Sequence, residues 1–244
     1  MANGFDPRAT AVPRSTTAGR DSVAVDAGLR SYMLSVYNYM ASGVLLTGIV
    51  SLLFARSGAA EAILFGPGAL KYVIMFSPLA FVMVLSFGIN RLSTGAMQAI
   101  FWTFAAVMGL SMASIFFVYT GASIAITFFA TAAAFVSLSL WGYTTKRDLS
   151  GFGTFLIMGV VGLIIASLLN LWFQSPAMNL AISGIGVLIF AGLTAYDTQK
   201  IKSIYFYVAG TDMLGKTAIM GALNLYLDFV NMFTFLLQFL GQRD

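Results

Sequence analysis

The sequence contains no cysteine and no histidine, and the two absences exclude several kinds of chemistry. Without cysteine there can be no disulfide, no thiolate metal ligand and no cysteine nucleophile. Without histidine the chain lacks the usual zinc ligand and the usual proton acceptor near neutral pH. Any proton transfer by this protein must therefore use carboxyl groups.

Charged residues are also scarce. They make up 9% of the 244 residues, whereas about 25% is typical of a soluble domain, and 59% of the residues are hydrophobic. This composition predicts a membrane protein. The net charge of +4 does not indicate nucleic-acid binding, because the basic residues stand at the ends of apolar runs and form no patch with stacking aromatic residues.

Seven apolar runs are long enough to cross the hydrocarbon core of a bilayer, which takes ~20 helical residues. They lie at about 34–55, 70–89, 96–119, 122–142, 152–173, 178–201 and 218–240. The chain is thus predicted to be an all-α membrane protein. Small residues at helical spacing, such as Gly109 with Ala113, predict close packing between helices.

The ends of the chain and its basic residues predict the orientation. Residues 1–30 lack the apolar core of a cleavable signal and predict a flexible cytoplasmic tail, followed by a transmembrane domain over 31–244. Ten of the thirteen Lys and Arg residues fall on the side of the N-terminus. The positive-inside rule then places the N-terminus in the cytoplasm and the C-terminus outside.

The segment from Gly210 to Thr217 matches the phosphate-loop pattern G-x-x-x-x-G-K-[ST]. A phosphate loop needs a strand that delivers it to a helix N-terminus, and the letters IYFYVA before it could pass for that strand. However, the segment lies in a predicted connection at 203–217 between two membrane helices, where no parallel sheet can form. The prediction is a solvated loop that binds no nucleotide.

Two of the nine acidic residues, Asp197 and Asp228, fall inside predicted membrane helices. An Asp at the centre of a membrane helix costs ~2.5–3.5 kcal/mol to insert, so such acids mark functional sites by default. The alternative is a structural carboxyl that forms a hydrogen bond to a neighbouring helix. Depth counting places Asp197 near the inner end of its helix and Asp228 about ten residues deep, so the two meet only if the helix boundaries shift by a few residues.

Around Asp228 the last helix carries a polar stripe. Asn224, Asn231 and Gln238 recur with Asp228 at helical spacing along one side. Such a face must look toward other helices or water, which makes this helix a candidate for the centre of the bundle. Two carboxyls in contact there would share one proton, and after losing it they would repel each other and offer oxygen ligands to a divalent cation such as Ca²⁺.

Four stretches of the sequence resemble the Bax inhibitor-1 family in its bacterial branch. They are AYDTQKIK at 195–202, LYLDFVNMFTFLLQFLG at 225–241, KRDLS at 146–150 and VYNYMASGVLLTG at 36–48. The resemblance implies six helices wrapped around a central seventh in the bacterial inner membrane, and a pH-sensitive calcium leak whose sensor is the pair Asp197 and Asp228. It also implies an arginine latch on that sensor, for which Arg91 is the matching position.

Three functions remain open. The first is the calcium leak, with Ca²⁺ as the permeant or regulatory ion and no bound cofactor. The second is a non-conducting regulator that binds another membrane protein, such as a membrane-anchored AAA protease, as the resemblance also implies. The third is an intramembrane aspartyl protease, which is disfavoured because the residues before Asp228 are not Gly-x-Gly and the chain has no Pro-Ala-Leu motif. The protein is therefore not expected to be an enzyme.

Overall fold

The computed structural model describes residues 15–243, and side chains from residue 25 onward. Within that range the chain is helical, and its only β-type pairing is an isolated bridge between Tyr119 and Arg243. The helices are α1 (Ser15–Arg56), α2 (Ala59–Leu64), α3 (Leu70–Gly88), α4 (Thr94–Met112), the 3-10 helix η1 (Ala113–Phe117), α5 (Gly121–Thr144), α6 (Ser150–Phe173), α7 (Pro176–Val208) and α8 (Met213–Leu240). Seven of the helices, with η1 extending α4, are long and apolar enough to cross a membrane, as predicted.

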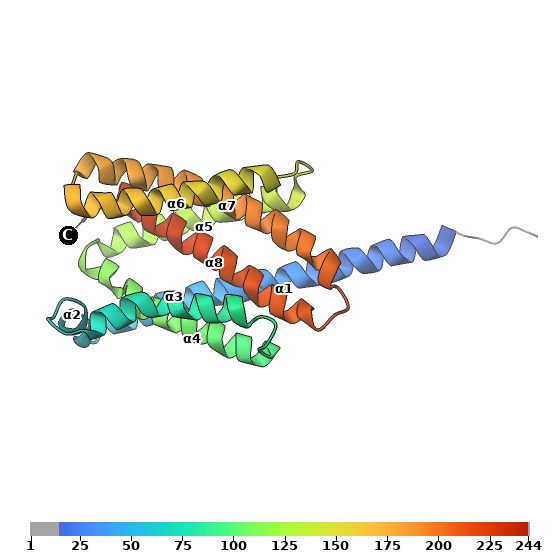
Figure 1. Cartoon of the computed structure of the whole chain (residues 1–244), viewed down its shortest axis with the longest axis horizontal. Coiled ribbons are helices and arrows are strands. Elements are labelled where there is room, and N and C mark those ends of the chain that lie inside the picture. Colours follow the sequence, from blue (N-terminus) through green and yellow to red (C-terminus); the bar gives the residue numbers. More distant parts are fainter. Residues whose placement is uncertain (1–14, 244) are drawn as a thin grey trace, which may run out of the picture.

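Short polar caps begin three of the membrane helices. The Ser93 and Thr120 hydroxyls accept hydrogen bonds from backbone N–H groups in the first turns of α4 and α5. Ser175 does the same for α7, where Pro176 occupies the first turn and needs no N–H partner. These caps mark the N-terminal ends of the three helices, and consecutive membrane helices run antiparallel (Figure 1).

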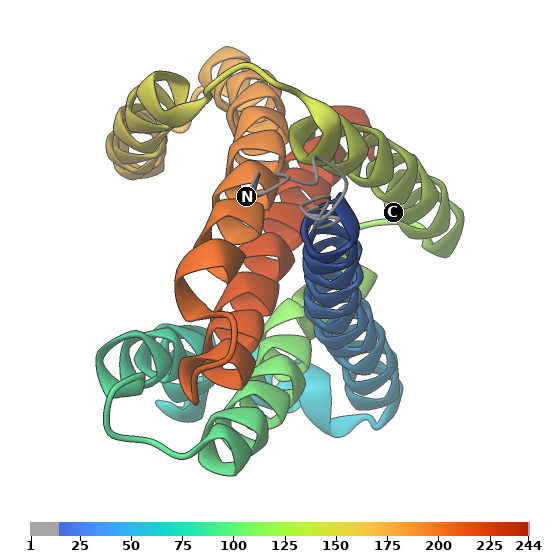
Figure 2. The same cartoon turned by 90° about the vertical axis from the view of Figure 1, so that its right-hand side faces the viewer.

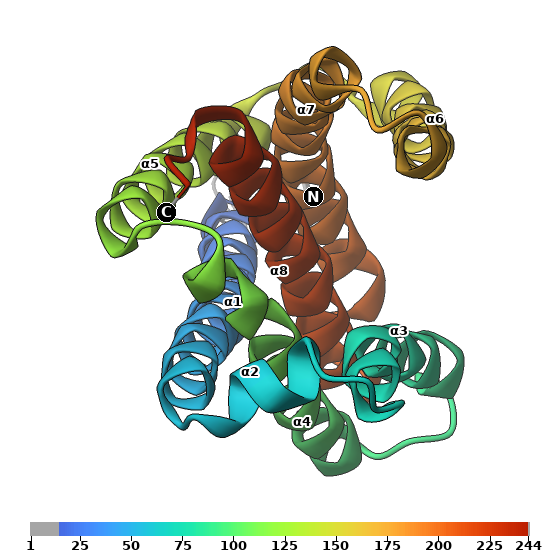
Figure 3. The same cartoon turned by 90° about the vertical axis from the view of Figure 1, so that its left-hand side faces the viewer.

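Helix α8 lies at the centre of the bundle (Figure 1). It is more buried than any other membrane helix and packs against α7, α1, α5 and α4. Seen from the end of the bundle in Figure 3, α6 lies on the outer side of α7 and does not reach α8. The prediction that the last membrane helix is central is therefore confirmed. α6 packs against α7 and surrounds α8 only indirectly.

Three predicted boundaries are wrong. α1 begins at Ser15, so residues 15–30 are helical where a flexible tail was predicted, and the first turns of this helix project beyond the bundle (Figures 1 and 2). Residues 1–14 of the predicted tail lie outside the described residues. α7 continues to Val208 and α8 begins at Met213, so the long loop predicted at 203–217 shrinks to residues 209–212.

The extension of α7 has a physical reason. Hydropathy falls at Lys200 and Lys202, where the membrane segment was expected to end, but no helix breaker occurs before Gly210. Gly210 adopts a φ of 76°, a backbone conformation that favours glycine, and it turns the chain into α8. At 33 residues α7 is ~50 Å long, which exceeds the ~30 Å hydrocarbon core.

Candidate functional site

The motif AYDT at 195–198 lies on α7, where successive residues face different neighbouring helices. Gly142 of α5 packs directly on the backbone of Ala195, since a Cβ on this glycine would lie 2.2 Å from the Ala195 carbonyl oxygen. The ring of Tyr196 covers Gly153 of α6 in a similar way. Two glycines thus allow α5 and α6 to approach α7 closely at the level of the motif.

Thr198 connects α7 to two further helices through hydroxyl groups. Its Oγ1 lies 2.9 Å from Ser139 Oγ of α5, and Ser139 Oγ lies 2.6 Å from the hydroxyl of Tyr37 on α1. Ser139 and Thr198 are buried. A short polar chain therefore crosses from α1 through α5 to α7 and ends beside Asp197 in the sequence.

Gln199 holds the connection between α5 and α6. Its Oε1 accepts a hydrogen bond from the backbone N–H of Leu149 at 2.9 Å, and its Nε2 donates to the carbonyl of Arg147 at 2.8 Å. In the same connection, hydrogen bonds from the hydroxyl and backbone N–H of Ser150 hold the pKa of Asp148 below its ordinary value. The KRDLS segment is thus anchored to α7.

Asp197 lies on the side of α7 that faces α8. Ile201, one turn further along α7, packs on Gly221 of α8. A Cβ added to Gly221 would lie 3.2 Å from the Ile201 side chain. The Asp197 side chain is partly buried, and its charge acts on Asp228. The structure therefore brings the two predicted acids into electrostatic range of each other.

The register between α7 and α8 sets the relative depth of the two acids. Ile201 opposes Gly221 at one end of the interface, and Gly186 of α7 opposes the ring of Phe235 at the other. In this antiparallel alignment Asp228 lies at the level of Thr194, which is ~4.5 Å, or about one helical turn, from the level of Asp197. The two acids are thus offset by about one turn along the interface, and direct contact between their carboxyl groups stays a prediction.

Asp228 is buried in the central helix, with only 4% of its surface exposed. Its Oδ2 atom has no hydrogen-bond partner among the described residues. Nearby on α8, Tyr226 forms a 2.6 Å hydrogen bond with Thr47 of α1, and the Phe229 ring packs on Phe135 of α5. Packed neighbours thus surround a carboxyl whose Oδ2 atom has no hydrogen-bond partner, although most buried polar atoms in proteins have one.

The other members of the polar stripe have different surroundings. Asn231 donates to the carbonyl of Leu227 on its own helix at 2.8 Å, and Gln238 accepts from Ser183 of α7 at 3.3 Å. Asn224 is partly buried, and by the same register it lies at the level of Asp197. Of the four residues of the stripe only Asp228 is buried, whereas Asn224, Asn231 and Gln238 are partly buried.

The described residues contain no group of three or more acidic side chains that could hold a metal ion. A divalent cation at this level would have Asp197 and Asp228 as its charged ligands. The unpaired Asp228 Oδ2 fits such a ligand set, since Ca²⁺ takes carboxylate and amide oxygens.

Two other sequence patterns lie away from the acids. Arg91 stands in the turn after α3 with an exposed side chain, and no contact joins it to either acid. The phosphate-loop pattern lies on the turn before α8 and on its first residues, and the Thr217 hydroxyl donates to the carbonyl of Met213 within the helix. Residues 204–208, which could have passed for a strand, are helical.

Sequence reasoning missed Tyr37, Ser139, Thr198 and Gln199. Hydroxyl groups are common in apolar helices because they can bond to their own backbone, as Ser137 does to Ala133. Nothing in the local sequence separates Ser139 from Ser137. Gln199 gave a weak signal, since it is an uncharged polar residue inside the motif AYDTQKIK.

Comparison with known sequences agrees with this architecture. Residues 29–244 match the profile of the family described as Bax1-I, inhibitor of apoptosis-promoting Bax1. The inner membrane protein YbhL of Escherichia coli is 48% identical over 219 residues, which cover 89% of this chain and 94% of YbhL. The protein RP147 of Rickettsia prowazekii is 44% identical over 231 residues, which cover 94% of this chain and 97% of RP147. The chain therefore belongs to the Bax inhibitor-1 family of membrane proteins.

Proposed function

We propose that the protein is a pH-sensitive calcium leak in which Asp197 and Asp228 control the passage of the ion beside α8. The observation that carries the proposal is the unpaired carboxylate oxygen of Asp228, buried in the central membrane helix and within electrostatic range of a second acid. A lone buried acid would be costly and without benefit to the fold. Two acids that repel each other form an element whose charge depends on pH.

The expected response follows from the charges. When one proton is bound between the acids, repulsion is relieved and α7 and α8 remain closely packed. When the proton is lost, the two negative charges repel each other and attract a divalent cation. The leak of Ca²⁺ therefore increases as pH rises. A leak moves Ca²⁺ across the membrane without making or breaking a covalent bond, so the proposed function is not enzymatic.

The orientation belongs to the same proposal. The connections between α3 and α4, α5 and α6, and α7 and α8 lie at the end of the bundle where the chain begins (Figure 1), and they contain or adjoin Arg91, Lys146, Arg147 and Lys216. The positive-inside rule places this end in the cytoplasm. The C-terminus then lies outside a bacterial inner membrane.

The test is calcium flux into liposomes that contain the purified protein and a calcium-sensitive dye, measured over a pH series. Asp197→Asn and Asp228→Asn keep the side-chain shape but cannot ionise, so both should abolish the pH dependence. Asp212→Asn is the matched control, because Asp212 is an exposed acid in the connection before α8. If both membrane variants leak and titrate like the parent, the proposal is wrong.

A non-conducting regulator is the second candidate. The helical extension of α1 beyond the bundle favours it, because it offers a surface outside the membrane for a partner such as a membrane-anchored protease (Figure 2). A partner that co-purifies with the parent and with both Asp→Asn variants, but not with a chain lacking residues 1–24, would support this function. Absence of calcium flux from the parent would then replace the leak by the regulator.

A further inference from the structure

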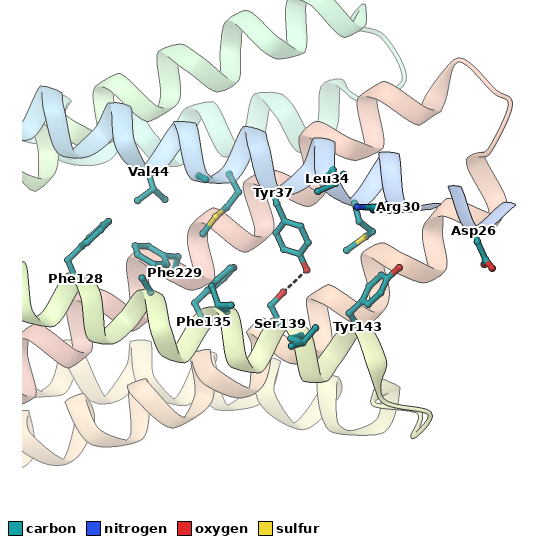
Figure 4. A pocket seen from close by; sticks show the side chains of 16 residues that line it. Asp26, Arg30, Leu34, Tyr37, Val44, Phe128, Phe135, Ser139, Tyr143 and Phe229 are labelled. Carbon is teal, nitrogen blue, oxygen red and sulfur yellow. Dashed lines mark hydrogen bonds between the residues drawn. The ribbon is translucent and has the colours of Figure 1, made fainter. Parts of the chain in front are cut away.

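A groove runs along the bundle between α1 and α5. Both helices pack on α8, but they pack poorly on each other, and the space between them has a volume of about 790 Å³ (Figure 4). Its floor includes Phe229 of α8, and its walls are largely apolar. The groove is separate from the α7–α8 interface that holds the two acids.

The groove opens toward the surface that faces lipid. Leu34 on the α1 rim and Val136 and Leu140 on the α5 rim are each at least 50% exposed. Exposed aliphatic side chains on membrane-spanning helices contact the hydrocarbon of the bilayer. A hydrocarbon chain can therefore enter the groove from the side without crossing water.

The length of the groove matches one leaflet of a membrane. Along α1 its lining extends from Asp26 to Val44, which is ~27 Å of helix, and the part from Arg30 to Val44 is ~21 Å long. A bilayer with its headgroups is ~40–45 Å thick, so one leaflet is about as deep as the groove is long from Arg30 to Val44. The groove therefore reaches from the level of the headgroups to about the middle of the bilayer.

One end of the groove is polar and positively charged. Arg30 and Tyr143 lie at this end, whereas Val44 and Phe128 lie at the other (Figure 4). The Lys202 ammonium lies 4.7 Å from the centre of the Tyr143 ring and donates to the Tyr143 carbonyl at 2.8 Å, which adds a second cation nearby. Asp26 also lines this end, one turn before Arg30. Arginine forms paired hydrogen bonds with phosphate groups.

We propose that this groove binds one phospholipid from the leaflet at that end, with an acyl chain between α1 and α5 and the headgroup phosphate at Arg30. The apolar walls, the lateral opening, the length of one leaflet and the cationic end together select an anionic phospholipid. The hydrogen bond between Tyr37 and Ser139 crosses the groove (Figure 4), so the bound lipid lies against the polar chain that connects α1, α5 and α7.

The first test measures lipid retention by native mass spectrometry, after the protein is extracted from liposomes of phosphatidylglycerol and phosphatidylethanolamine. Ala132 lines the groove, whereas the adjacent Ala133 is exposed on the outer face of α5. Ala132→Trp should lower retention of the lipid by at least about tenfold, and Ala133→Trp should behave like the parent. Equal retention by these two variants would overturn the proposal.

The second test concerns the headgroup and does not depend on the folding of a Trp variant. Arg30→Gln should lower the preference for phosphatidylglycerol over phosphatidylethanolamine by about fivefold, since a cation near anionic lipid contributes that much. Asp26→Asn should raise the preference. Arg56→Gln, at the other end of the same helix, is the control. An unchanged preference in Arg30→Gln would refute the assigned position of the phosphate.

Discussion

Replacing Asp228 by leucine should make the protein more stable, although the residue is buried in the central helix. Leucine has a similar shape, and it removes a carboxylate oxygen that has no hydrogen-bond partner among the described residues. An unsatisfied buried polar group costs about 1–3 kcal/mol. Burying an ionised carboxyl costs more than burying a neutral one, so the gain at pH 8 should be no smaller than at pH 5.

The assay is thermal unfolding in detergent at both pH values. For a chain of this size each kcal/mol shifts Tm by about 2–4 °C, so an increase of several degrees is expected. Tyr226→Phe is the control from the same helix, because it removes the hydroxyl that bonds to Thr47 at 2.6 Å. This variant should lose about 0.5–1.5 kcal/mol.

The opposite result would refute the reasoning about Asp228. If Asp228→Leu lowers Tm as much as Tyr226→Phe does, the carboxyl stabilises the fold through a hydrogen bond. The acid would then be a structural residue, as the alternative reading of the sequence holds. The experiment thus separates a residue that costs stability for its function from one that contributes to it, without any measurement of ion flux.

Three further variants test the packing, the polar chain and the polar connection. Gly142→Ala should lower the free energy of unfolding by about 1–3 kcal/mol, because the new Cβ would lie 2.2 Å from the Ala195 carbonyl oxygen. Gly162→Ala is the control, since its Cβ would meet nothing within 4 Å and the variant should be tolerated. Equal effects of the two variants in a thermal unfolding assay would contradict the close approach of α5 to α7. Ser139→Ala should lose about 0.5–1.5 kcal/mol by interrupting the chain from Tyr37 to Thr198, and Ser137→Ala, which loses only a bond within its own helix, should lose less. Ser150→Ala should return the pKa of Asp148 toward its ordinary value. Because the pKa of Asp148 is lower in the folded than in the unfolded protein, this acid stabilises the parent at high pH, and the stabilisation is lost as pH falls through the folded-state pKa. The variant should therefore lose less Tm than the parent on acidification.

The membrane spans could be predicted because the signal for them is local. A run of apolar residues such as 152–173 must cross the bilayer whatever it packs against, and the structure places α6 at Ser150–Phe173. The predicted last residue of α7 and the predicted first residue of α8 were wrong, because hydropathy indicates where the chain crosses the membrane and not where a helix begins or ends. At Lys202 the membrane segment was expected to stop, but the backbone continues as a helix to Val208.

The candidate site also contains residues that the sequence alone identifies and residues that only the fold reveals. Asp197 and Asp228 stand out because an acid in an apolar run is costly wherever it lies. Ser139 became visible only in the fold, since its difference from Ser137 is the helix face on which it lies. The groove between α1 and α5 also could not be predicted from the sequence, because it results from the poor packing of two helices that are far apart in the chain.

The offset between the acids constrains how they could act in the proposed leak. Bringing the two acids to the same level would require α7 and α8 to slide by about one turn, or ~4.5 Å. Such a slide would move Ile201 away from Gly221 and the Phe235 ring away from Gly186, and each would meet a larger side chain. Both ends of the interface oppose the movement, because packed helices resist continuous sliding. A cation or water molecule between the two levels would connect the carboxyls without moving either helix. The register therefore favours a pair that acts in place, through the reach of its side chains or through a bridging ligand, over one that closes by sliding of the helices.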